Sequence, residues 1–154
     1  PHFPGSAGFL IFDAIGVHPY SYPALPSYVD WWNRWQQLVR IHDTMVQAGD
    51  VAKKVWITEY GAPTGGEGNA HTSTQLGEYI YEKDYMSEEA QDDLLRDAVR
   101  LHQEYAAWTG PFFWYSLRDN GTSRDTPENF FGLLRNDNSK KPAYNTYQKI
   151  LKGQ

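Results

Sequence analysis

The sequence has no cysteine and few basic residues, and these two absences exclude whole classes of function. Without cysteine there is no thiol nucleophile and no cysteine metal site. Lys and Arg number 14 against 19 Asp and Glu, which gives a formal net charge of −5. Phosphate backbones and anionic lipid surfaces find little to bind here, so we expect neither nucleic acid nor membrane as a partner.

Long apolar runs are also missing. No stretch approaches the roughly 18 apolar residues of a membrane span, and residues 1–4 do not form the basic and then apolar pattern of a signal peptide. The 154 residues contain no linker, fixed repeat or low-complexity tract. We therefore expect a single domain over residues 1–154, with room for a core that needs no disulfide or structural metal.

Aromatic side chains, in contrast, are abundant: 7 Phe, 6 Trp and 11 Tyr make up 16% of the chain. On composition alone, an aromatic-rich core is the simpler interpretation. Aromatic rings also offer flat apolar faces, with a polar tip on Tyr and Trp, which suits sugar rings that carry both C–H faces and hydroxyls.

Three strand-like segments alternate with three segments of helical spacing. The expected strands are residues 13–18, 55–59 and 112–117, and the expected helices are residues 27–48, 87–109 and 142 onward. A long loop over residues 61–85 is a candidate functional loop, and a hairpin is expected around residues 136–139. This order predicts the α/β class with parallel βα units. Three units do not close a sheet, so the chain is expected to be part of a larger fold.

Period-two alternation predicts which side chains share a face of each strand. The predicted inward rows are Ala14, Gly16 and His18, then Val55, Ile57 and Glu59, then Phe112, Trp114 and Ser116. In a barrel the active-site face lies at the carboxyl ends of the strands. We therefore expect Glu59, at the end of its row, to point into the mouth of the fold.

Four segments, taken in order, resemble parts of one enzyme clan. Residues 13–20, 56–61, 113–117 and 129–144 are similar to consecutive strand ends and the closing segment of clan A retaining glycoside hydrolases. The nearest similarity is to family 39 and to family 5, cellulase-like barrels. The resemblance covers nearly the whole chain and implies a partial (β/α)8 TIM barrel made of strands six to eight.

The same resemblance implies roles for individual residues in a reaction that cleaves β-linked polysaccharide or oligosaccharide. Glu59 would be the nucleophile that attacks the anomeric carbon. His18 and Tyr20 would hydrogen-bond the sugar and the nucleophile, and Trp114 would be the aromatic platform under the sugar. Further loop contacts to the substrate are expected from Tyr60, Arg118, Asp119 and Asn120. No cofactor or metal is implied, and export from the cell is expected because polysaccharide is extracellular.

One required group has no counterpart in the sequence. Retaining hydrolysis needs a second carboxylic acid about 5–5.5 Å from the first, and in the family this is the Glu of an Asn-Glu pair on strand four. No Asn-Glu dipeptide occurs here. Two interpretations stay open: a piece of a retaining hydrolase, completed by a missing N-terminal barrel half or by homo-oligomerisation, or a non-catalytic carbohydrate-binding or interaction module.

Two other patterns are set aside. His18, Glu59 and His71 lack the spacing of a metal site. The sequon at Asn120 is a pattern that is common by chance, and a glycan there would crowd the proposed cleft.

Overall fold

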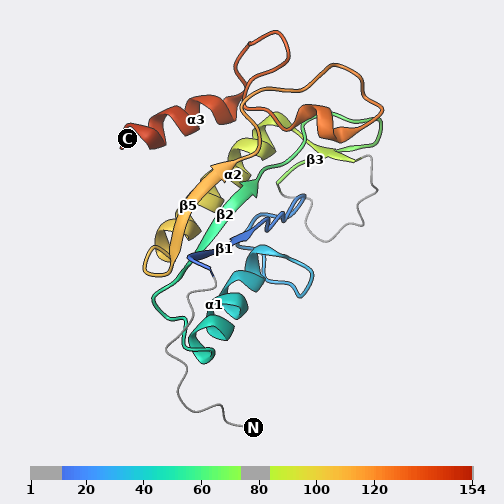
Figure 1. The fold of residues 1–154 in the computed structure, drawn as a ribbon. Coiled ribbons are helices and arrows are strands. Elements are labelled where there is room, and N and C mark those ends of the chain that lie inside the picture. The colour runs from blue at the N-terminus through green and yellow to red at the C-terminus, as the bar shows by residue number, and fades with distance from the viewer. Residues whose placement is uncertain (1–11, 74–83, 154) are drawn as a thin grey trace.

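A parallel three-stranded sheet forms the centre of the computed structural model, which describes residues 12–73 and 84–153. Strand β2 (Lys54–Tyr60) lies between β1 (Ala14–Val17) and β5 (Thr109–Trp114). Figure 1 shows the three strands side by side, with α2 running behind β2 and β5. The predicted α/β class, with parallel strands, is confirmed.

Some of the helix ends coincide with local signals in the sequence. They are α1 (Leu38–Gln47) with a preceding 3-10 turn η1 (Trp35–Gln37), α2 (Glu88–Glu104) and α3 (Pro142–Leu151). The Ser87 hydroxyl accepts a hydrogen bond from the Ala90 amide at 3.1 Å and caps α2. Gly49, with φ +88°, follows the end of α1. Within the described ranges, no helix has the length and hydropathy needed to cross a membrane.

Two helix predictions need correction. The first helix starts at Leu38, well after residue 27, because the Asn33 side chain holds the preceding segment as a loop by donating to the Leu25, Pro26 and Tyr28 carbonyls. Helix α2 ends at Glu104, and the Gly110–Pro111 pair that was expected to terminate it lies inside β5.

The predicted loop over residues 61–85 contains a short parallel ribbon. Strand β3 (Ala70–His71) pairs with β4 (Tyr85–Met86), and His71 Nε2 lies 2.9 Å from Asp84 Oδ2. Residues 74–83 of this loop lie outside the described residues. A second 3-10 turn, η2 (Pro127–Phe130), follows β5.

The core lies between the sheet and helices α1 and α2. The apolar side chains of β2 that were predicted to face inward in a barrel face these helices instead. Val55 and Ile57 are fully buried against these helices, together with Tyr60. The pairing of β2 with β5 is irregular between Ile57 and Tyr60. This irregularity places Tyr60, not Glu59, in the helix-facing row, so Glu59 lies on the opposite face.

The predicted assignment of side chains to the two faces of the sheet is correct for β1 and wrong for β5. Ile15 and Val17 pack against the core, which leaves Ala14 and Gly16 on the face away from the helices, as expected. Phe112 and Trp114 pack with the core side chains and so face the helices.

The face of the sheet away from the helices is open. Trp56 and Phe113 are 40% and 50% exposed there. Among the described residues, β1 and β5 each pair with β2 alone in this sheet, so both edges of the sheet are free.

A buried ion pair ties the loop after β5 to the start of α3. Asp119 and Lys141 are 5% and 1% exposed, and Lys141 Nζ donates to Asp119 Oδ1 at 2.7 Å. The same carboxylate oxygen accepts the Gly132 amide at 2.8 Å, and Lys141 also donates to the Phe130 carbonyl at 3.1 Å. Residues 119–141 are thus held against the carboxyl ends of β2 and β5.

The ion pair predicts a large difference between two adjacent lysines. Lys141→Met leaves the Asp119 carboxylate buried and unpaired, and we expect the free energy of unfolding to fall by about 3–5 kcal/mol. Lys140→Met, at an exposed position beside the Tyr144 ring, should cost less than about 1 kcal/mol. Urea unfolding of both variants measures the difference, and equal effects would contradict this role of the pair.

Candidate active site

Glu59 lies at the carboxyl end of β2 with two polar partners from the segment after β1. The Tyr20 hydroxyl donates to Glu59 Oε2 at 3.1 Å, and His18 Nδ1 lies 3.4 Å from the same oxygen. The Glu59 side chain is 40% exposed. The carboxylate is therefore oriented by its neighbours and still open to a ligand. The structure brings together the three residues that sequence analysis grouped.

Aromatic rings hold Tyr20 in place. Its ring stacks on Tyr60 at 6.3 Å between centroids and makes an edge contact with Phe131 at 6.0 Å. Burial raises the pKa of the Tyr20 hydroxyl, and the hydrogen bond to Glu59 and the charges of Glu59 and Glu128 raise it further. Tyr20 is thus kept as a hydrogen-bond donor.

The structure corrects the expected positions of two aromatic residues. Tyr60 is fully buried, and its hydroxyl shares a hydrogen bond of 2.7 Å with Ser21 Oγ, so it lies beneath the site and not in it. Trp114 packs against Tyr60 and against the side chains between the sheet and helices α2 and α3. Because Trp114 faces the helices, it is not placed as a platform in the mouth.

Tyr115, which sequence analysis missed, lies beside Glu59 instead. Its amide donates to the Tyr60 carbonyl at 2.8 Å, and its hydroxyl donates to Glu128 Oε1 at 2.9 Å. The two strand ends approach so closely that a Cβ on Gly61 would lie 2.2 Å from the Tyr115 carbonyl oxygen, so only glycine fits there. The signal that could have found Tyr115 was the run of aromatics at 112–115. The predicted row contained Phe112 and Trp114, whereas the alternate row contains Phe113 and Tyr115.

The three expected loop contacts after β5 have different surroundings. Asn120 is exposed, and its side chain hydrogen-bonds the Tyr115 side chain, which places it at this rim. Arg118 is exposed and donates to Asn138 Oδ1 at 3.1 Å. Asp119 is buried against Lys141, whose Nζ donates to its Oδ1.

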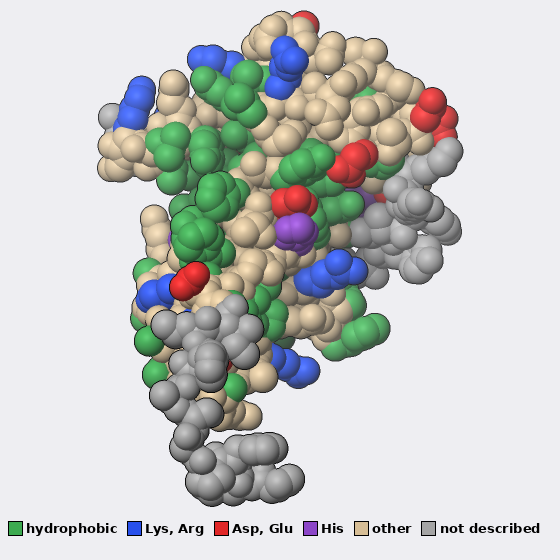
Figure 2. Space-filling model, in the orientation of Figure 1, with side chains coloured by type: hydrophobic (Ala, Val, Ile, Leu, Met, Phe, Trp, Pro, Cys, Tyr) green, Lys and Arg blue, Asp and Glu red, His purple; other side chains and the backbone are tan. Residues whose placement is uncertain are grey.

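The molecular surface carries charged and apolar groups together on this side. Figure 2 shows an acidic side chain directly beside a histidine near the centre of the face, with hydrophobic side chains to both sides. In the parts of the chain that the structure describes, no group of three or more His, Asp or Glu side chains is arranged to hold a metal ion.

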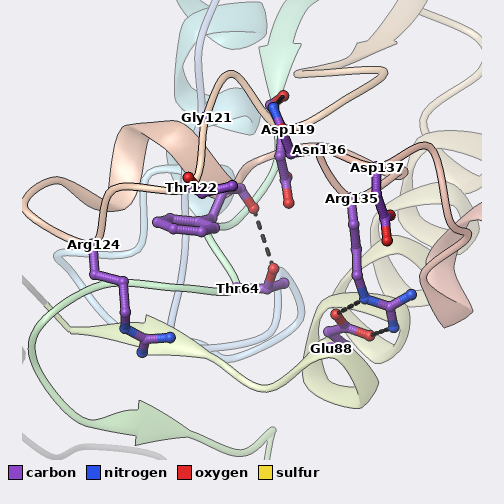
Figure 3. A pocket seen from close by; sticks show the side chains of 10 residues that line it. Thr64, Glu88, Asp119, Gly121, Thr122, Arg124, Arg135, Asn136 and Asp137 are labelled. Atoms are coloured by element: carbon purple, nitrogen blue, oxygen red, sulfur yellow. Dashed lines mark hydrogen bonds and ion pairs between the residues drawn. The ribbon is translucent and has the colours of Figure 1, made fainter.

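A separate pocket of about 380 Å³ lies among the loops that follow β2 and β5. Its lining includes Thr64, Glu88, Asp119, Arg124 and Arg135 and none of the residues that contact Glu59. Figure 3 shows Arg135 aimed at Glu88, with Arg124 on the other side of the pocket. Arg135 Nε donates to Glu88 Oε1 at 2.8 Å, and Arg124 Nε donates to the Gly66 carbonyl at 2.8 Å. These charges serve to join the loops.

Comparison with known proteins finds matches among solved structures alone, since no protein-family profile and no curated protein matches the chain. A family 39 glycoside hydrolase from the gut symbiont Bacteroides cellulosilyticus WH2 is similar, with a TM-score of 0.59 and 24% identity, over 90% of this chain and 26% of that chain. A β-glucuronidase from Bifidobacterium dentium matches with a TM-score of 0.57 and 19% identity, over 93% and 21%. One from Ruminococcus gnavus matches with a TM-score of 0.57 and 19% identity, over 92% and 23%.

These matches define the class of fold. The chain spans about a quarter of the length of these glycoside hydrolases. Its fold is that of a part of a glycoside hydrolase barrel.

The contact between Tyr20 and Glu59 predicts a coupled titration. Replacing Glu59 by Gln removes a negative charge beside the hydroxyl, so the pKa of Tyr20 should fall. Tyrosinate absorbance, measured with and without Tyr20→Phe in each background, isolates this residue. Glu89→Gln, an exposed position in the first turn of α2, is the control and should leave the titration unchanged. A pKa of Tyr20 that does not move in Glu59→Gln would contradict the contact.

Proposed function

We propose that this chain carries the nucleophile side of a retaining glycoside hydrolase active site, with Glu59 as the nucleophile. The observation that carries the proposal is the position of Glu59. It is a partly exposed carboxylate at the carboxyl end of a parallel strand, and a tyrosine hydroxyl and a histidine nitrogen lie at one of its oxygens. The barrel-like fold and the glycoside hydrolase neighbours support the same class.

In this proposal Glu59 Oε attacks the anomeric carbon of the bound sugar as the glycosidic bond breaks. The electron pair of that bond leaves with the aglycone oxygen, and a glycosyl ester forms on Glu59. Tyr20 and His18 orient the carboxylate and contact the sugar. Water then attacks the anomeric carbon and gives a proton to the carboxylate that served as the acid in the first step, while the bond to Glu59 breaks and frees its carboxylate. The two inversions together retain the anomeric configuration.

Protonation of the leaving oxygen needs a carboxylic acid that we assign to no residue of this chain. The family places that acid in an Asn-Glu pair, which the sequence lacks. A non-catalytic carbohydrate-binding module is therefore the second candidate function, and this absence is the observation that favours it.

We also propose that further βα units of a barrel cover the open face of the sheet. Trp56 and Phe113 are exposed on that face, and both edge strands have free backbone groups. The chain matches about a quarter of each neighbour, and the rest of such a barrel is the occupant that fits a parallel sheet with two free edges among the described residues. These units would also supply the missing carboxylic acid.

The nucleophile is tested with activated 2-deoxy-2-fluoro glycosides of glucose, xylose, mannose and galactose. Their leaving groups need little acid assistance, so the missing acid is not required. We expect an increase in intact mass by one glycosyl group that maps to Glu59 and is absent in Glu59→Gln. Glu89→Gln is the matched control and should label like the wild type. If a folded sample forms no adduct with any sugar, the nucleophile assignment is wrong, and retention on polysaccharide would favour the binding module.

The covering units are tested with a hydrophobic dye and by sedimentation. We expect the chain alone to bind the dye, and Trp56→Ser to reduce that binding, whereas Val51→Ser, at a position that is 65% exposed outside the sheet, should not. Absence of dye binding by a monomer would show that the face needs no cover. A discrete dimer that Trp56→Ser dissociates would assign the face to a second copy of the chain and contradict the proposed occupant.

A further inference from the structure

Turn η2 carries a second glutamate, Glu128, to the rim where Glu59 lies. The turn is fixed to both strand ends: the Thr64 amide, beyond β2, donates to the Phe130 carbonyl at 3.1 Å, and the Ser116 amide, beyond β5, donates to the Phe131 carbonyl at 3.1 Å. Glu128 itself is exposed. Its position is thus set by backbone bonds, and its exposed side chain can meet a ligand.

The two glutamates have matching environments. Tyr20 donates to Glu59, and Tyr115 donates to Glu128 Oε1. Both tyrosine rings make edge contacts with the buried Phe131 ring, at 6.0 Å and 5.5 Å between centroids. One buried ring therefore spaces two tyrosines, and each tyrosine holds one carboxylate.

The effects of the Glu59 and Glu128 charges on the two tyrosines also indicate that the two carboxylates lie at the same rim. The hydrogen bond to Glu128 is the first cause of the raised pKa of Tyr115, and the charge of Glu59 adds to it. The charge of Glu128 likewise adds to the raised pKa of Tyr20. Each tyrosine is thus within electrostatic reach of both carboxylates. A cationic side chain, Arg34, acts by its charge on the neighbouring Tyr22.

We propose that Glu128 binds the hydroxyls of a neutral sugar and selects against sugars that carry a carboxylate, an inference that rests on the proposed function of Glu59. Tyr115 occupies Oε1 as a donor, which leaves Oε2 to accept from a sugar hydroxyl. A uronic acid would bring a third carboxylate to a site that already holds two. Like charges brought together in this way lower affinity, and the site discriminates by that repulsion.

The test uses reagents that differ at one carbon. A 2-deoxy-2-fluoro glucosyl fluoride and the matching glucuronosyl fluoride have the same ring and leaving group, and they differ only in a hydroxymethyl or carboxylate group at C6. The galactose and mannose pairs are used in the same way. The rate of adduct formation on Glu59 is measured in the wild type, in Glu128→Gln and in the control Glu89→Gln.

We expect the wild type to label with the neutral reagent at least about tenfold faster than with the uronic acid. Glu128→Gln should lower the rate of adduct formation with the neutral reagent about tenfold, as for loss of a hydrogen bond to a charged group. It should also reduce the ratio of the neutral rate to the uronic acid rate. Glu89→Gln should behave as the wild type. Equal or faster labelling by the uronic acid, or no effect of Glu128→Gln, would overturn the role of Glu128 while the role of Glu59 stands.

A binding measurement separates this inference from the proposed nucleophile. Calorimetric titration of Glu59→Gln with an aryl β-glucoside, and with the β-glucuronide of the same aryl group, requires no adduct. Tighter binding of the glucoside that Glu128→Gln abolishes supports Glu128 even if Glu59 forms no ester. Equal binding of the two ligands, or binding of neither, overturns it.

Discussion

The buried ion pair between Asp119 and Lys141 is the interaction on which the site end of the molecule depends. Either charge left alone inside the protein would cost several kcal/mol, so the two side chains have to meet. Their meeting closes the loop after β5, and the Gly132 and Phe130 backbone groups join the same cluster. The closed loop carries η2 and Phe131 onto the strand ends. The shape of the rim is therefore set by a pair of charges that are buried away from any ligand.

Three helix ends with a local signal could be predicted from the sequence, whereas the beginning of α1 and the end of α2 could not. Ser87 caps α2, Gly49 follows α1, and Pro142 opens α3, each through the conformation or hydrogen bonding of a single residue. Before α1, the apolar spacing is compatible with a helix. There the Asn33 side chain offers the backbone a different set of partners, and spacing alone does not reveal that competition.

The faces of β2 and β5 show why alternation has limits. Alternation assigns side chains to two rows, but it does not say which row meets the helices when both rows contain apolar residues, as Val55 and Trp56 do. Irregular pairing after Ile57 then shifts the phase next to Glu59. Glu59 could be found because it lies at a strand end, where parallel strands bring side chains together, and its partners His18 and Tyr20 were expected from the resemblance to glycoside hydrolases. Glu128 could not, because its position depends on a distant ion pair and on the close packing around Phe131.

The close approach at Gly61 limits how such a site can change over evolution. A Cβ at position 61 would lie 2.2 Å from the Tyr115 carbonyl oxygen, so this position admits no side chain. The backbone close to Glu59 therefore cannot gain a new side chain by substitution of Gly61. Exposed positions on the loop after β5, Asn120 and Glu128 among them, carry no such restriction. New ligand preferences can therefore arise by exchange of loop side chains while the spacing of the strand ends is inherited unchanged.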